Sequence, residues 1–153
     1  MNRLITIAFA ILLAIPTAFA QFGSGGPVSI SNTATNTNRT LCSIRGANFN
    51  ITTDQACTIP AGVTAWAPTS IVVTNCTGTF TLAAGGVYPA TSKGGTALVS
   101  AAQAYTALTG LGLTLVAGIA TTRQTINTVY LSLTTGTGSA ATCDFYLWGN
   151  DLT

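Results

Sequence analysis

Apolar and polar residues alternate most regularly in the last third of the chain. Every second position is apolar in three segments, which contain Leu111, Leu113 and Leu115, then Val129, Leu131 and Leu133, and finally Cys143, Phe145 and Leu147. A period of two is typical of a strand with one face on a core and the other toward solvent. We therefore expect three strands here, the last two separated by a turn at Gly136–Ser139.

Shorter strand candidates precede this region. They are rich in β-branched and apolar residues and comprise Leu41–Ile44, Ala56–Ile59, Ser70–Cys76 and Thr79–Leu82. Residues that favour turns separate them. Asn48–Asp54 is predicted to be a loop, Pro60–Gly62 closes the second candidate, and Gly85-Gly86 ends the fourth.

The segment Thr96–Thr109 fits two structures. Leu98, Ala102, Tyr105 and Leu108 have helical spacing, whereas Val99, Ala101, Gln103 and Tyr105 have strand spacing. Because the neighbouring segments are β-like, we favour extended structure, with one short helix near 96–109 as the alternative. About seven short strands separated by turns predict a mainly β fold, either an antiparallel sandwich or a jelly-roll-like arrangement.

The N-terminus has the pattern of a signal peptide. Arg3 precedes an apolar run, Leu4–Ile15, and Ala18-Phe19-Ala20 then forms a small-x-small cleavage pattern. As a helix the run would rise only about 18 Å, which is short of a bilayer core of about 30 Å. We expect export to the periplasm or the extracellular space, with no membrane span after cleavage of residues 1–20.

The rest of the chain divides into two predicted parts. Residues 21–37 are rich in Gly, Ser, Thr and Asn and are expected to form a flexible arm, or an arm that orders against a neighbouring subunit. Residues 38–153 are expected to form a single β domain, since this length suffices for one core.

All four cysteines follow the proposed cleavage site: Cys42, Cys57, Cys76 and Cys143. An even number in an exported chain suggests two disulfides. Their spacing matches no zinc site, so we expect no metal. A hairpin through the 48–54 loop would bring Cys42 opposite Cys57 and leave Cys76 for Cys143. The main alternative pairs Cys42 with Cys76 and Cys57 with Cys143.

Charged residues are sparse. The chain has five Lys and Arg, three Asp and Glu, and a net charge of +2, which becomes +1 once Arg3 is removed. This charge offers no electrostatic footprint for nucleic acid. Weak repulsion between copies favours association, so self-association or contact with other surface proteins is the expected mode of action.

The side chains that enzymes use for proton transfer are largely missing. The chain has no histidine and no glutamate, which excludes Ser-His and Cys-His nucleophile systems. Neither of the glycine-rich phosphate-binding motifs, G-x-x-x-x-G-K-[ST] or G-x-G-x-x-G, is present in the sequence. We therefore expect no enzymatic activity, no catalytic residue and no cofactor.

Four aromatic residues are candidates for binding: Trp66, Tyr130, Tyr146 and Trp148. Exposed aromatic rings with polar neighbours stack on sugar rings or anchor protein interfaces. The favoured interpretation is that most of these rings fill a second core layer, because a sandwich has two sheets to cover.

Several stretches resemble small, poorly characterised β-rich proteins encoded among bacteriophage and prophage virion genes. They are Leu82–Val99, Gln103-Ala104-Tyr105, Val129–Thr135, and Asp54-Gln55-Ala56 before Ile59-Pro60. The resemblance covers roughly residues 48–150 and implies a structural or surface-attached module. The signal peptide and the cysteines depart from the pattern and suggest an exported relative.

Two hypotheses on function follow. The first is an exported, non-enzymatic structural or interaction module, related to phage virion surface proteins. The second is a secreted carbohydrate- or ligand-binding module that uses exposed aromatic residues.

Overall fold

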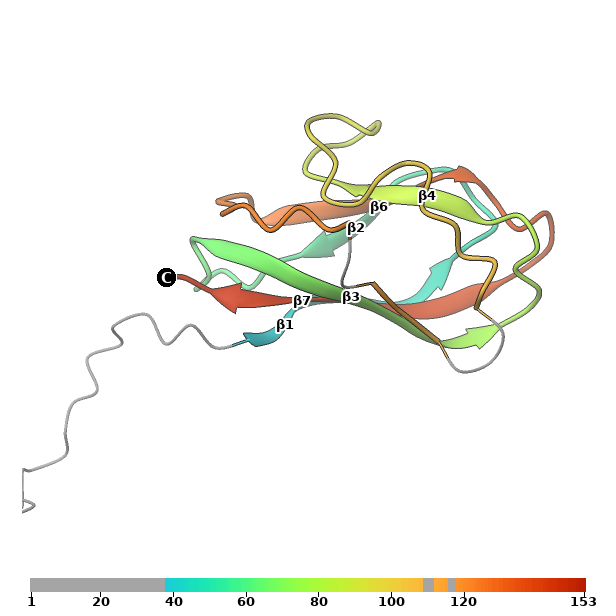
Figure 1. Ribbon diagram of the computed structural model, residues 1–153, viewed down its shortest axis with the longest axis horizontal. Helices are drawn as coiled ribbons and strands as arrows, with labels where there is room; N and C mark the ends of the chain where they lie inside the picture. The colour runs from blue at the N-terminus through green and yellow to red at the C-terminus, as the bar shows by residue number, and fades with distance from the viewer. Residues whose placement is uncertain (1–37, 109–111, 116–117) are drawn as a thin grey trace, which may run out of the picture. The chain divides into compact units, whose positions relative to one another are not determined.

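The computed structural model describes residues 38–108, 112–115 and 118–153. The predicted signal peptide and arm lie outside these residues. Two antiparallel sheets form two layers (Figure 1). The four-stranded sheet has the order β1 (Asn38–Asn48), β7 (Thr142–Asp151), β3 (Trp66–Thr77), β5 (Leu113–Leu115). The three-stranded sheet has the order β2 (Gln55–Thr58), β6 (Thr128–Thr135), β4 (Ala84–Tyr88). This arrangement confirms the predicted mainly β, sandwich-like fold with seven strands.

The core lies between the two sheets and follows the predicted alternation. Phe145 and Leu147 of β7 are fully buried, as are Val129, Leu131 and Leu133 of β6. Burying such side chains contributes about 1.5–3 kcal/mol each, so the residues of the period-two pattern stabilise the packing of the two sheets. Among the described residues, no helix is long and apolar enough to cross a membrane.

The segment 96–109 matches neither a regular strand nor the alternative short helix, because its described part contains turns and isolated β-bridges. None of its described residues, 96–108, is helical. Instead the segment pairs irregularly with the free edge of β4: Leu98 donates its N–H to the Val87 carbonyl oxygen at 2.8 Å, and the Gln103 carbonyl oxygen accepts from Gly85 at 2.9 Å. The edge of the three-stranded sheet is thereby covered.

Two predictions at the start of β4 were wrong. Thr79–Leu82 is not a strand, because only Phe80 of its two large apolar side chains reaches the core, while Leu82 is 62% exposed. Gly85 and Gly86 lie inside β4 and do not end a strand. A Cβ atom on Gly86 would collide with the Val99 carbonyl oxygen. The glycines permit close backbone approach at this point.

Both disulfides are present, in the favoured pairing. Cys42 is bonded to Cys57, with Cα atoms 5.6 Å apart, and Cys76 to Cys143, with Cα atoms 4.2 Å apart. The reasoning behind the first pair was wrong, because β1 and β2 form no hairpin and belong to different sheets. Cys42–Cys57 joins the two layers, while Cys76–Cys143 joins the adjacent strands β3 and β7.

Candidate functional site

The outer face of the four-stranded sheet carries two of the predicted binding aromatics. Tyr146 and Trp148 are half-buried and lie on the same side of β7. Tyr146 is opposite Val72 of β3, and Trp148 lies between Thr40 of β1 and Ser70 of β3. Residues directly opposite one another share a face of the sheet. We call Val72, Tyr146 and Trp148 the aromatic face.

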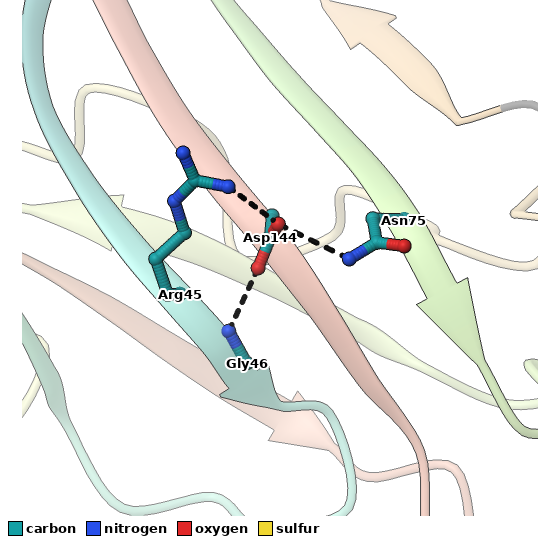
Figure 2. A network of polar contacts seen from close by, with 4 residues as sticks. All are labelled: Arg45, Gly46, Asn75 and Asp144. Atoms are coloured by element: carbon teal, nitrogen blue, oxygen red, sulfur yellow. Dashed lines mark hydrogen bonds and ion pairs between the residues drawn. The ribbon is translucent and has the colours of Figure 1, made fainter.

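A charged cluster borders this face where β1, β7 and β3 run side by side (Figure 2). The carboxylate of Asp144 on β7 accepts three hydrogen bonds. They come from the Arg45 guanidinium at 3.0 Å, the Gly46 backbone N–H at 2.9 Å and the Asn75 side-chain amide at 3.2 Å. These bonds lower the pKa of Asp144, and the bond from the Gly46 backbone has the largest effect.

The cluster lies at two irregularities in the sheet. The ladder from β1 to β7 shifts between Ile44 and Ala47, and the ladder from β3 to β7 shifts between Thr74 and Thr77. Gly46 and Asn75 lie in these bulges with φ values of 62° and 51°, a conformation that glycine and asparagine tolerate best. The carboxylate of Asp144 therefore accepts a hydrogen bond from a residue with left-handed backbone conformation in each of the two bulges.

Arg45 links this cluster to the aromatic face. Its guanidinium carbon lies 5.0 Å from the centre of the Tyr146 ring, which is within cation–π distance. Because Asp144 neutralises Arg45, the aromatic face has no uncompensated charge at this border. Low charge of this kind is typical of the centre of a protein interface.

A cleft of about 740 Å³ lies on the other layer, over the start of β6. We call it the end cleft. Its apolar walls include Pro60, Pro89 and Ile126, its polar groups include Thr91 and Asn127, and Tyr130 also lines it. None of the twelve lining residues is charged.

The order of strands in the three-stranded sheet creates the end cleft. Antiparallel pairing places Thr58, the last residue of β2, opposite Thr128, and Tyr88, the last residue of β4, opposite Tyr130. Both strands therefore end beside the beginning of β6. The connections that follow them form the two walls, at Pro60 and Pro89, and the residues before β6 complete the cleft.

Of the four aromatic residues named as candidates for binding, Trp66 is not at the surface. It is fully buried, and its indole N–H donates to the Ile126 carbonyl oxygen at 2.8 Å. It therefore belongs to the core and offers no binding surface. Tyr146 and Trp148 lie together on the aromatic face, and Tyr130 lies apart from them in the end cleft.

Sequence reasoning missed the role of several residues. Neither Asp144 nor Pro89 was singled out for a role, and Pro60 was treated only as part of a turn that closes a strand. The Pro-containing turns were a usable signal, because rigid loops often build binding sites. Nothing in the sequence pattern indicates that Gly46 and Asn75 converge on one carboxylate.

The three aspartates are held in structural hydrogen bonds. Asp54 accepts the backbone N–H of Ser92, and Asp151 accepts that of Thr153, which in each case is the main reason for a lowered pKa. Asp144 and Asp151 lie seven positions apart on β7, about 23 Å at the usual rise. A two-carboxylate glycosidase pair is at most about 9.5 Å apart. In the described part of the chain, no three metal-ligating side chains form a cluster.

Comparisons of the chain with protein-family models, with curated proteins and with solved structures give no match.

Proposed function

We propose that the protein is an exported, non-enzymatic interaction module that associates with copies of itself or with other surface or virion proteins. The observation that carries the proposal is the aromatic face, where Tyr146, Trp148 and Val72 lie together on the open side of the four-stranded sheet. Interfaces are enriched in aromatic residues, and tryptophan and tyrosine dominate their binding energy.

The surrounding chemistry supports association over catalysis. Tyr146 and Trp148 are two positions apart on one strand, so they lie on the same face of the sheet with their Cα atoms about 6.6 Å apart. Polar uncharged residues, Thr40 and Ser70, lie beside Trp148. The nearest charges, Arg45 and Asp144, neutralise each other at 3.0 Å. Two such faces meet without burying an unpaired charge.

Export is supported by the two disulfides, which persist in oxidising compartments and are rare in reducing ones. The absence of histidine and glutamate in the sequence supports a non-enzymatic role. The likeness to virion proteins stays a prediction about the class of partner.

Sedimentation velocity across a concentration series tests this proposal. The wild-type protein, expressed with its signal peptide and purified after export, should form oligomers. The double variant Tyr146→Ser/Trp148→Ser should weaken association by at least about tenfold, or ~1.4 kcal/mol. Tyr130→Ser is the matched control, because it removes a half-buried ring from the other sheet, and it should associate as wild type does.

Two results would overturn the proposal. One is a wild-type protein that stays monomeric at concentrations up to about 1 mM and with which no surface protein co-purifies. The other is undiminished association of the double variant while its circular dichroism and thermal unfolding show an intact fold.

A further inference from the structure

We infer that the end cleft is a binding site for a neutral oligosaccharide, separate from the aromatic face. The cleft lies over β6 of the three-stranded sheet, and the aromatic face lies on the outer side of the four-stranded sheet. Its volume, about 740 Å³, lies in the range of clefts that enclose small ligands, about 300–1,000 Å³.

The side chains around the end cleft select the chemical class. Thr91, Asn127 and Thr128 supply groups that both donate and accept hydrogen bonds, as sugar hydroxyls require. Tyr130 supplies an aromatic ring on which the C–H face of a pyranose stacks. With no charged residue in the lining, the cleft has nothing to balance a phosphate, a carboxylate or an ammonium group. A neutral, polar ligand with apolar faces fits these groups best.

The position of β6 argues against an extended peptide as the ligand. Peptides that bind to sheets usually add a strand at a free edge and use its backbone hydrogen bonds. β6 is the central strand and pairs with β2 through Tyr130–Ala56 and with β4 through Tyr130–Tyr88. Its backbone groups are already used on both sides. Recognition at this cleft therefore depends on side chains, as it does for sugars.

The walls of the end cleft are fixed before any ligand arrives. The backbone carbonyl oxygen of Asn127 accepts the Ile59 backbone N–H at 2.9 Å, and the Val63 backbone N–H donates to the Pro60 carbonyl oxygen at 2.8 Å. Trp66 donates from the core to the carbonyl oxygen of Ile126. Two of these hydrogen bonds attach the 125–128 segment to residues 59 and 66, and the third closes a turn within the 60–64 segment. A preformed site loses little conformational entropy on binding.

Titration of the ¹⁵N-labelled exported protein with three neutral trisaccharides tests this site. The probes are maltotriose, cellotriose and triacetylchitotriose. At least one should bind with a dissociation constant of about 1 mM or tighter, and the shifted amide signals should cluster at Ala61, Thr91 and Asn127. Tyr130→Ala should weaken binding at least about tenfold, whereas Tyr130→Phe should retain stacking and most of the affinity.

Trp148→Ala is the matched control, since it removes a half-buried ring from the opposite layer and should leave saccharide affinity unchanged. Absence of binding by all three probes at about 10 mM would overturn the inference. So would affinity that survives Tyr130→Ala but falls in Trp148→Ala, or shifted signals confined to β7. Loss of saccharide binding does not bear on association through the aromatic face, which sedimentation measures independently.

Discussion

The two sheets share one core but differ on their outer faces. On the four-stranded sheet, the residues that point away from the core, Tyr146 and Trp148, stay half-buried. On the three-stranded sheet, Tyr88 and Ser132 also point away from the core but are only 5% and 0% exposed, and Tyr130 alone of these three is half-buried. The backbone at Val99 lies against Gly86 on that side, and the long connection after β4 runs along this layer (Figure 1). Alternation in a strand therefore predicts which side chains face the core, but exposure of the others depends on what the connections cover.

The disulfides offer the strongest test of this difference between the layers. Replacing Cys76 and Cys143 with alanine removes the bond between β3 and β7 and opens a loop of 67 residues, and replacing Cys42 and Cys57 removes the bond between the layers and opens a loop of 15 residues. The chain-entropy model expects a loss of about 4.4 kcal/mol for the first and about 3 kcal/mol for the second. Urea unfolding of both double variants measures the two losses.

The reverse order would change the interpretation of the two layers. If loss of the Cys42–Cys57 bond costs more, the bond between the layers stabilises the protein by more than its loop length alone predicts. Wild-type protein treated with an alkylating agent without reductant is the control, and it should unfold as untreated protein does, because no cysteine is free in the structure.

A substitution at Gly86 tests the covered face directly. Gly86→Ala places a Cβ atom against the Val99 carbonyl oxygen, so the 98–104 segment must move away from β4. Overpacking of this kind costs about 1–3 kcal/mol, measured by thermal unfolding. Gly62→Ala is the control: nothing lies within 4 Å of its added Cβ, and its effect should stay within about 0.5 kcal/mol. Equal stability of the two variants would show that the segment is not held against the sheet.

In the four-stranded sheet, the ionisation of Asp144 should make stability depend on pH. Its pKa is lowered in the folded protein, chiefly by the Gly46 backbone N–H, while the unfolded value is about 3.9. Its contribution to stability is therefore fully present above about pH 4 and is lost as pH falls through the lower folded pKa. Asp144→Asn should unfold at a lower temperature than wild type at pH 7, and the gap should narrow below about pH 4.

Asp54→Asn is the comparison for that experiment, because Asp54 also accepts a backbone N–H but belongs to the other layer. If the cluster of Arg45, Asn75 and Asp144 holds the bulges in register, Asp144→Asn will have the larger effect of the two at pH 7. Identical pH profiles for Asp144→Asn and wild type would contradict this role.

The predictions from sequence succeeded where a strand has regular neighbours. Leu131 and Phe145 were placed correctly in the core because each lies in a central strand with partners on both sides. They failed for Gly85 and Gly86, whose turn-forming character was overridden by close approach of another segment. Trp66, one of the candidates for binding, lies in the core, as the favoured interpretation of the aromatic residues expected, but sequence spacing does not reveal that its indole N–H finds a partner at Ile126.

The candidate sites could also be predicted only in part from the sequence. Tyr130, Tyr146 and Trp148 were recognised as outward-facing because the period of a strand is a local property of the backbone. Their separation into an aromatic face and an end cleft was not predictable, since it depends on which strands belong to which sheet. The sequence favoured the correct disulfide partners, but it did not show that Cys42–Cys57 joins the two layers while Cys76–Cys143 joins neighbouring strands of one sheet.

The sequence by itself determined the mainly β class, the residues of β6 and β7 that face the core, and a surface poor in charge. These features follow from side-chain period and composition, which each segment carries without reference to the others. Tertiary structure alone decided that Asp144 would unite two bulges and that the ends of β2 and β4 would enclose Tyr130. Both sites join residues far apart in the chain, and only the pairing of strands brings those residues within contact distance.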